Sequence, residues 1–298
     1  MPSPFRLHAV GAIALLLSAC TNLNGKPAEA PSPPARPVIA LALGGGAAKG
    51  FAHIGVIKAL EAQGIVPDII IGTSAGSVVG AMYAAGKNGF ELQTLAITLD
   101  ESQVSDWSLP DRGVLKGDAL AAFINKAVGN IPIEKLPRKF GAVATDLASG
   151  EPIVFRSGDT GTAVRASISV PRIFQPLSIR GHEYVDGGLV SPVPVRFARE
   201  MGATFIIAVD ISNKPQMGKT KSSLDVLLQT FAIMGQSLNR SELPLADIII
   251  RPDISQLASA DFKTRHLAVL EGEKAAAQAL PALKAKLDSW QKANPRKE

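Results

Sequence analysis

A single serine, Ser74, stands between two glycines where an apolar run meets a run of small residues. The stretch IIIGTSAGSVVGAMYAAG, residues 69–86, is typical of a strand that leads directly into a helix. It fits the pattern G-x-S-x-G, in which the serine lies on a strained turn and the flanking glycines allow neighbouring backbone to approach closely. The sequence therefore predicts Ser74 as a nucleophile and the N–H of Ala75 as a donor to an oxyanion.

The rest of the chain alternates apolar runs with helical periodicity, which predicts an α/β fold with a mostly parallel sheet covered by helices. The expected strands lie within residues 38–45, 67–72, 139–147, 151–158, 182–188, 204–212 and 246–253. The expected helices include residues 90–101, 118–129, 159–170, 194–203, 223–240 and 263–290, the last interrupted by Pro281. Residues 107–117 are expected to form a loop or lid.

Length and composition allow one large domain. The chain has 298 residues, of which 46% are hydrophobic, enough for one sizeable core. We expect residues 38–212 to form a catalytic core and residues 213–298 to complete the same domain. The net charge is +5, and the basic residues are dispersed without interleaved aromatics, which argues against a nucleic-acid partner. The excess charge fits either ordinary solubility or a mild attraction to anionic membranes.

The N-terminal segment MPSPFRLHAVGAIALLLSAC has one arginine followed by an apolar stretch that is too short to span a bilayer. Residues 1–19 therefore predict a secretory signal. LSAC, residues 17–20, resembles the lipobox of bacterial lipoprotein signals. That resemblance implies an exported protein anchored through a lipid on Cys20, and Thr21 after it favours the outer membrane, on its periplasmic or surface side. An ordinary cleaved signal is the alternative.

Residues 20–37 are rich in proline and nearly free of large apolar side chains. This composition predicts a disordered or polyproline-like tether. Cys20 is the only cysteine, so the chain can form neither an internal disulfide nor a cysteine-based metal cluster. Because the four histidines are also scattered, we expect no metal and no cofactor.

Three consecutive glycines follow the first expected strand in LALGGGAAKGFAHIGVIKAL, residues 41–60. The loop lacks the third glycine of a dinucleotide fingerprint, because Lys49 stands there, and it lacks the Gly-Lys-Ser/Thr of a phosphate-binding P-loop. Apart from a plain tight turn, the remaining interpretation is an anion site, with backbone N–H groups converging at a helix N-terminus. Such donors stabilise a tetrahedral oxyanion by about 3–4 kcal/mol each.

The serine needs a base, and the chain has four histidines. His8 lies in the signal segment, and His53 is expected to pack near the site or to be structural. His182 is expected at the solvent end of a hairpin. His266 comes late enough in the chain for the order Ser, Asp, His of α/β-hydrolases, although its surroundings predict a helix start.

Three carboxylates also follow expected strands. Asp186 precedes two glycines in EYVDGGLVSPVPV, and their tight turn would aim its side chain over the sheet edge. Asp146 and Asp210 are more typical of turn or cap residues. A carboxylate can take the serine proton when burial or hydrogen bonding brings its basicity near the working pH. Asp186 and His266 thus both remain candidates for the base.

Together, GGGAAKG, GTSAG and DGG resemble patatin-like phospholipases in order and approximate spacing, and SISVPRIFQPLSIRGHEYVDGG is similar to their bacterial branch. The resemblance covers about residues 38–212. It implies a three-layer α/β/α sandwich with a mostly parallel central sheet, and a lipid acyl hydrolase with a Ser–Asp dyad. Carried over by motif, Ser74 is the nucleophile and Asp186 the base. The amides implied for the oxyanion hole are those of Gly45, Gly46 and Ala47.

Lys49 stands where the family motif often has arginine, so a cation remains for substrate binding but the planar fork is lost. Three hypotheses follow. The favoured one is a membrane-anchored serine acyl hydrolase that cleaves phospholipids or related lipid esters through an acyl-enzyme. The others are an α/β-hydrolase-type esterase with a triad through His266, and a lipoprotein that binds lipid without catalysis.

Overall fold

The computed structural model describes residues 36–294 except 101, 103, 108–111, 216–219 and 256–263. The expected signal segment, Cys20 with its neighbour Thr21, and all of the expected tether before residue 36 lie outside the described residues. Among the residues described, no helix is both long enough and apolar enough to cross a bilayer.

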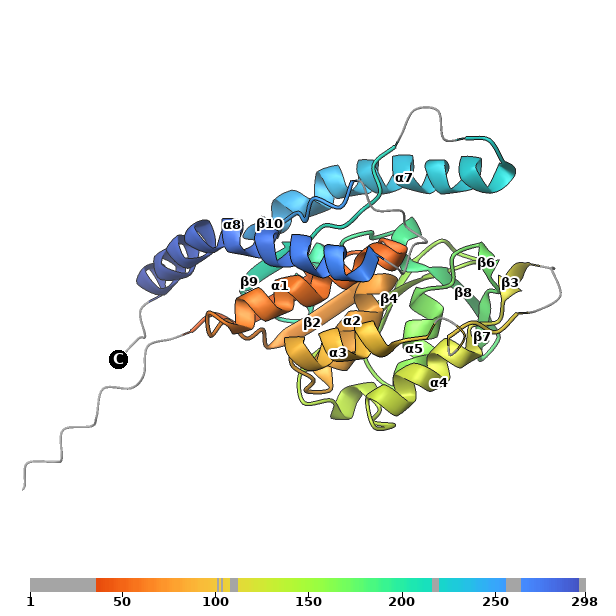
Figure 1. Cartoon of the computed structure of the whole chain (residues 1–298), viewed down its shortest axis with the longest axis horizontal. Coiled ribbons are helices and arrows are strands. Elements are labelled where there is room, and N and C mark those ends of the chain that lie inside the picture. Colours follow the sequence, from red (N-terminus) through yellow and green to blue (C-terminus); the bar gives the residue numbers. More distant parts are fainter. Residues whose placement is uncertain are drawn as a thin grey trace, which may run out of the picture.

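A single large sheet forms the centre of the molecule (Figure 1). Its strand order is β10-β9-β1-β2-β4-β8-β7, and β5 also pairs with β4. The first five strands of this order pair in parallel, whereas β5, β8 and β7 join through antiparallel pairs. The strands are β1 (Ile39–Leu43), β2 (Ile69–Thr73), β4 (Lys139–Asp146), β5 (Pro152–Phe155), β7 (Leu177–Ile179), β8 (His182–Asp186), β9 (Phe205–Val209) and β10 (Ile248–Ile250).

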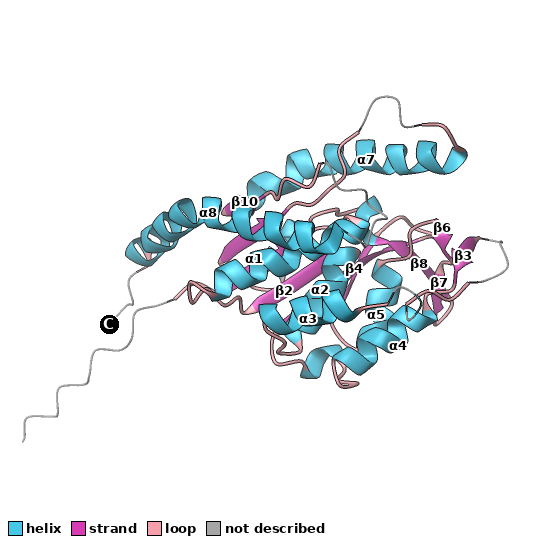
Figure 2. Cartoon of the chain, in the orientation of Figure 1, coloured by secondary structure: helices cyan, strands magenta, loops and turns pink. Residues whose placement is uncertain are grey.

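Helices cover both faces of this sheet (Figure 2). The α-helices are α1 (Phe51–Glu61), α2 (Ala75–Ala84), α3 (Gly89–Thr98), α4 (Asp118–Ala127), α5 (Thr160–Ser167), α6 (Val195–Glu200), α7 (Ser223–Glu242) and α8 (Arg265–Ala293). Short 3₁₀ turns are η1 (Ala47–Gly50), η3 (Ile133–Lys135), η4 (Gly187–Leu189) and η5 (Leu243–Leu245). The predicted three-layer arrangement around a mostly parallel sheet is confirmed.

The alternation of side chains along β1 separates two hydrophobic cores. Leu41 and Leu43 point into the larger core, which they share with α1 to α5 and α8. Ala40 and Ala42 point to the other face and pack with α6 and η5. Because successive side chains of a strand point to opposite faces, one buried strand can serve both layers.

The last helix, α8, lies along α1 (Figure 1) at a distance that only glycine permits. A Cβ on Gly272 would stand 2.0 Å from the carbonyl oxygen of Ala52, and one on Gly55 would stand 1.9 Å from that of Val269. The helix also continues through Pro281, where the sequence predicts an interruption. A proline removes one helical hydrogen bond, but Leu283 beyond it is fully buried, so packing on the core holds the helix together.

A second, smaller sheet replaces part of the expected loop or lid. β3 (Gly113–Leu115) pairs in parallel with β6 (Arg172–Phe174). Each strand has only three residues, so neither shows the alternation over four or more residues that predicts a strand from sequence. Their pairing ties residues 113–115 to the chain that leads into β7.

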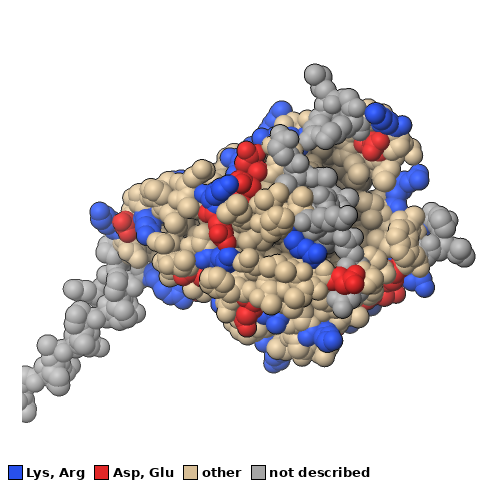
Figure 3. All heavy atoms as spheres, in the orientation of Figure 1, with Lys and Arg blue, Asp and Glu red and all other residues tan. Residues whose placement is uncertain are grey.

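Charged side chains of both signs are interspersed over the face that Figure 3 shows. Several ion pairs lie at the surface, for example Arg36 with Asp68 and Arg112 with Glu183. Exposed pairs contribute less than about 1 kcal/mol each. The two hydrophobic cores therefore account for the fold better than surface charge does.

We expect Gly272→Ala to lower the free energy of unfolding by about 1–3 kcal/mol, because the added methyl group meets the backbone of α1. Helix propensity alone predicts the opposite, a gain of about 1 kcal/mol for alanine over glycine. Urea unfolding of the variant, with Gln278→Ala in the same helix as control, distinguishes the two. A stabilised Gly272→Ala variant would contradict the close packing of α1 and α8.

Candidate active site

Ser74 lies on a sharp turn between β2 and α2. Its backbone has φ 52° and ψ −123°, a conformation that costs a residue other than glycine about 1–3 kcal/mol. The glycines on either side allow the turn. A Cβ on Gly76 would stand 2.1 Å from the carbonyl oxygen of Leu43, and one on Gly72 would stand 2.3 Å from the backbone of Gly76.

Buried hydroxyl groups hold this turn. The N–H of Ser74 donates to Oγ of Ser167 at 2.9 Å, and that hydroxyl donates to the carbonyl of Val143 at 2.6 Å. The hydroxyl of Ser77 donates to the carbonyl of Ser74 at 2.7 Å. Both backbone polar groups of Ser74 are therefore engaged, which fixes the direction in which its side chain leaves the backbone.

Two strand ends meet along one side of β4. In the β2 pairing Thr73 lies opposite Val143, and in the β8 pairing Asp186 lies opposite the next residue, Ala144. β5 pairs with Val143 and Ala144 as well, so it occupies the other side of β4. Since β2 is parallel to β4 and β8 is antiparallel to it, β2 and β8 run toward each other. Ser74 directly follows one strand end, and Asp186 is the other.

The carboxyl group of Asp186 is buried and only partly satisfied. Its Oδ1 accepts the N–H of Gly188 at 2.7 Å, whereas its Oδ2 is buried without a partner in hydrogen-bonding geometry. Burial raises the pKa of Asp186 to about 6, although the nearby Ser74 hydroxyl and the Gly188 N–H lower it. The Ser74 hydroxyl thus acts on this carboxyl without an aligned hydrogen bond, as is common before substrate binds.

His53 is buried on α1 and faces the glycine loop. Its Nε2 lies 2.8 Å from the carbonyl oxygen of Gly44, so this nitrogen carries the proton and donates. Burial lowers the pKa of His53 to about 4, which keeps the ring neutral. His53 therefore fixes the conformation of the loop and has no hydrogen bond to Ser74 in the part of the chain described.

The other rival groups have partners of their own. Asp146 accepts Nδ1 of His182 at 2.9 Å and the N–H groups of its own turn, and these contacts lower its pKa to about 2. Asp210 accepts Nε of Arg251 at 3.2 Å. His266 is exposed in the first turn of α8, and no described hydrogen bond links it to Ser74.

The N–H of Gly45 is not free to bind an oxyanion, contrary to the sequence-based expectation. It donates to the carbonyl of Pro192 at 2.9 Å, and a backbone N–H has one hydrogen to give. The glycine loop still lies close to Ser74, because a Cβ on Gly45 would stand 3.2 Å from Cβ of Ser74. No described hydrogen bond occupies the other expected donors, the N–H groups of Gly46, Ala47 and Ala75.

Ala47 and Ala75 each open a helical turn, η1 and α2, whose first N–H groups have no partner within the helix. Lys49, the expected substrate contact, lies in η1 and is only 5% exposed, so its role with substrate stays a prediction. Within the described ranges, no group of three His, Cys, Asp or Glu side chains is arranged to hold a metal ion.

A family model described as patatin-like phospholipase matches residues 41–199, more than half of the chain, and this range includes Ser74 and Asp186. The chain belongs to the patatin-like phospholipase family.

Several relatives match this chain over part of their own length. Two uncharacterised NTE family proteins of Mycobacterium tuberculosis are 37% identical over 179 residues and 30% identical over 271 residues. These matches cover 59% and 82% of this chain, and 49% and 46% of the relatives. Patatin-like phospholipase domain-containing protein 6 of Mus musculus is 32% identical over 229 residues, which are 74% of this chain and 16% of that protein. The chain therefore spans half or less of the length of each.

Two solved structures share the patatin-like fold at low sequence identity. VipD from Legionella pneumophila has a TM-score of 0.54 at 17% identity, over 84% of this chain and 68% of that one. Full-length ExoU from Pseudomonas aeruginosa, in complex with SpcU, has a TM-score of 0.51 at 14% identity, over 85% of this chain and 53% of that one. Identities this low show a common fold alone.

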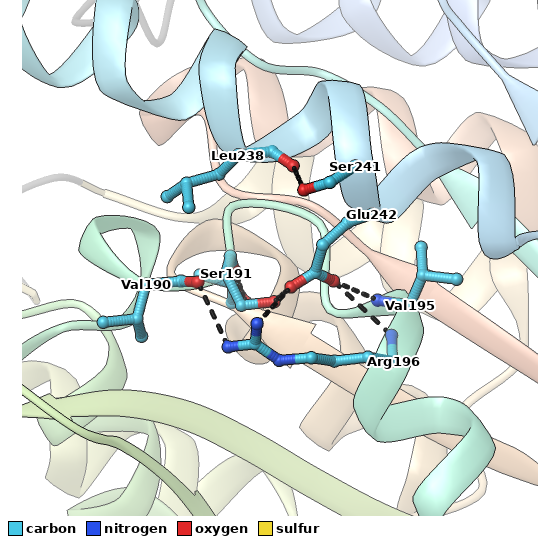
Figure 4. A network of polar contacts seen from close by, with 8 residues as sticks. Val190, Ser191, Val195, Arg196, Leu238, Ser241 and Glu242 are labelled. Carbon is cyan, nitrogen blue, oxygen red and sulfur yellow. Dashed lines mark hydrogen bonds and ion pairs between the residues drawn. The ribbon is translucent and has the colours of Figure 1, made fainter.

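The patatin-like site has a support that sequence analysis missed. Glu242, the last residue of α7, is 3% exposed and points into the segment that follows Asp186 (Figure 4). Its carboxylate accepts the hydroxyl of Ser191 at 2.9 Å and the N–H of Val195 at 3.1 Å, and it pairs with Arg196 at 3.3 Å. Burial raises its pKa, while Ser191 and Arg196 oppose that effect.

This segment, residues 187–195, contacts both other parts of the site. The carbonyl of Ser191 accepts the hydroxyl of Thr73, the residue before Ser74, at 2.8 Å. The carbonyl of Pro192 accepts the N–H of Gly45. A carboxylate in the last turn of a helix opposes the helix dipole, and this is the signal by which the sequence could have pointed to Glu242.

We expect Glu242→Ala to lower the free energy of unfolding by about 2–4 kcal/mol, because it leaves buried donors of Ser191 and Val195 unsatisfied. Glu242→Gln, which keeps one acceptor oxygen, should lose less. Chemical unfolding of both variants measures the effect, with Glu271→Ala on the surface of α8 as control. Equal, small losses for all three variants would show that Glu242 does not hold this segment.

The raised pKa of Asp186 also leads to a prediction for how stability depends on pH. The folded state holds the proton better than the unfolded chain, so ionisation of Asp186 destabilises the fold as the pH rises from about 4 through 6. Above pH 6 the penalty approaches about 3 kcal/mol. Asp186→Asn removes the ionisation and keeps an acceptor for Gly188. Urea unfolding should therefore find this variant more stable than wild type at pH 8, with an advantage that shrinks toward pH 4. An advantage independent of pH would rule out this origin.

Proposed function

We propose that the chain is a serine acyl hydrolase that cleaves carboxylic esters of phospholipids or related lipids with a dyad of Ser74 and Asp186. The convergence of the ends of β2 and β8 on β4 carries this proposal. It supports a pairing between a nucleophile on a strained turn and a carboxyl whose pKa is raised to about 6. Family membership supports lipid esters as the substrate class.

In the first half of the proposed reaction, Asp186 takes the proton of the Ser74 hydroxyl as Oγ attacks the ester carbonyl. The negative charge that develops on the carbonyl oxygen is bound by N–H groups of Gly46, Ala47 and Ala75, which no described hydrogen bond occupies. Collapse of the tetrahedral intermediate expels the alcohol, which receives the proton from Asp186, and leaves the acyl group on Ser74.

In the second half, Asp186 takes a proton from water, and the hydroxide attacks the acyl-enzyme at the same carbonyl carbon. The fatty acid leaves and the proton returns to Ser74. A carboxyl with a pKa of about 6 is ionised at neutral pH, yet basic enough to share a proton with the hydroxyl. The proposed reaction requires no imidazole, and no described hydrogen bond links His53 or His266 to Ser74.

We also propose that the enzyme works at a membrane. The signal-like residues 1–19, the lipobox-like Cys20 and the proline-rich residues 20–37 support an exported protein held to a bacterial membrane by a lipid anchor. Lysophospholipid or phospholipid ester is the favoured substrate at that surface.

The dyad predicts that Ser74→Ala and Asp186→Asn each lower kcat/KM toward a soluble acyl ester by at least about a thousandfold, because each removes one half of a unit that moves a single proton. His266→Ala should retain turnover close to that of wild type. A fluorophosphonate probe should label wild type and His266→Ala, but not Ser74→Ala.

Each alternative has its own outcome in the same experiment. Collapse of turnover in His266→Ala would indicate a triad. Wild-type protein that stays unlabelled and inactive would indicate a lipid-binding protein without catalysis. An active Asp186→Asn variant would contradict the proposed dyad.

A further inference from the structure

The end of α5 is bonded to the backbone of both residues of the proposed dyad. The hydroxyl of Ser167 accepts the N–H of Ser74 at 2.9 Å, and the carbonyl of Ser169 accepts the N–H of Asp186 at 3.0 Å. Helix α5 also contacts α2, which follows Ser74, and β8, which ends on Asp186 (Figure 1). Residues 167–169, here called the α5 turn, therefore hold two residues that come from different strands.

A buried arginine holds the α5 turn. Arg165 is 2% exposed, and its Nη1 donates to the hydroxyl oxygen of Ser169 at 2.5 Å. The same hydroxyl donates to the backbone carbonyl of Arg165 at 2.7 Å. The other amino group, Nη2, donates to the carbonyl of Gln175 at 2.7 Å, and the N–H of Gln175 donates to the carbonyl of Leu115 in β3 at 2.9 Å. Because the donors of a planar guanidinium are fixed in direction, Arg165 sets the position of the α5 turn relative to the small sheet of β3 and β6.

The guanidinium has no carboxylate partner in the described part of the chain. Burial lowers the pKa of Arg165, and Asp118 and Asp106 oppose this effect without forming an ion pair with it. Its Nε is buried without a hydrogen-bond partner among the same residues. Space for the side chain depends on Gly117, because a Cβ there would stand 2.1 Å from this Nε. A buried charge without a partner of opposite sign costs stability, so packing alone favours an apolar side chain at this position.

We propose that Arg165 is a positioning residue of the active site. By holding the α5 turn, it keeps the backbones of Ser74 and Asp186 at the separation at which one proton can pass between their side chains. No described hydrogen bond links Arg165 to either of them, so it acts through Ser169 and the α5 turn. This inference rests on the proposed function, because only a working dyad has a geometry to maintain.

The first test compares the steady-state kinetics of wild type and Arg165→Met with a soluble acyl ester. Displacement of reacting groups by about 1 Å costs roughly a hundredfold in rate. We therefore expect kcat to fall by about a hundredfold while KM changes by less than about twofold. Arg165→Lys should recover part of the loss, since an ammonium group can still donate to Ser169. The end point of fluorophosphonate labelling counts the folded enzyme, so that kcat refers to folded molecules alone.

A double-mutant cycle tests the route through Ser169. Ser169→Ala removes the hydroxyl and keeps the carbonyl that binds Asp186, so kcat should fall by about tenfold, the equivalent of one hydrogen bond. The double variant Arg165→Met/Ser169→Ala should be no slower than Arg165→Met, because both changes break the same contact. Ser169→Ala also tests the proposal on its own if Arg165→Met does not fold.

Arg138→Met is the matched control. Arg138 likewise donates to a backbone carbonyl, that of Tyr83 at 2.7 Å, and its Cζ lies 4.5 Å from the centre of the Tyr83 ring. It directly precedes β4, whereas Asp186 pairs with Ala144 near the other end of that strand. The kcat of this variant should stay close to that of wild type.

The outcomes separate this proposal from the proposed function. Values of kcat close to wild type in Arg165→Met and Ser169→Ala, with Asp186→Asn inactive, overturn the positioning role and leave the dyad standing. A loss confined to KM assigns Arg165 to substrate binding, and losses that multiply in the double variant separate it from Ser169; both results overturn the proposal. An equal loss in Arg138→Met does so as well. An active Asp186→Asn variant refutes the dyad itself and, with it, the positioning role.

Discussion

The candidate site depends on two strands that run toward each other along one side of β4. β2 and β8 pair with consecutive residues of β4, so the residue that ends β8 lies next to the turn that follows β2. The mixed direction of the sheet is the reason this is possible, since two strands both parallel to β4 could not bring their carboxyl ends together on it. Ser74 and Asp186, more than a hundred residues apart in sequence, thereby become neighbours at the ends of two strands.

Around this junction, the structure fixes backbone more than side chains. Hydroxyl groups of Ser167 and Ser77 hold the polar groups of Ser74, and Thr145 holds the carbonyl of Asp186. Residues 187–195 then connect the carboxyl, the glycine loop and α7, and Glu242 secures that segment from above (Figure 4). The rigid surroundings account for a strained Ser74 and a carboxyl with one unpartnered oxygen, because both conditions persist only where neighbouring contacts determine the conformation.

The features of the fold and the site that the sequence predicted are those marked by a local pattern of residues. The apolar runs and the turn at Ser74 predicted the central sheet and its layers, because burial on both faces of a parallel strand leaves a continuous mark. Asp186 was also marked locally, by the two glycines after it. The sequence could not show that the N–H of Gly45 is occupied. Its acceptor is the carbonyl of Pro192, and no sequence pattern connects these two distant residues. The pairing of β3 with β6 was missed because three-residue strands have no periodicity.

β1 places the start of the described chain and the glycine loop at opposite ends of the sheet. The described chain enters at Arg36, which shares a cleft with Gln291 near the end of α8, while the glycine loop leaves the opposite end of a five-residue strand about 16 Å long. Anything bound to the residues before Arg36 would therefore approach the side of the protein opposite to the glycine loop. If the proposed lipid anchor at Cys20 holds the chain, the body would have to turn over to act on the anchoring membrane. Without that turn, the glycine loop would face away from it, toward a second membrane.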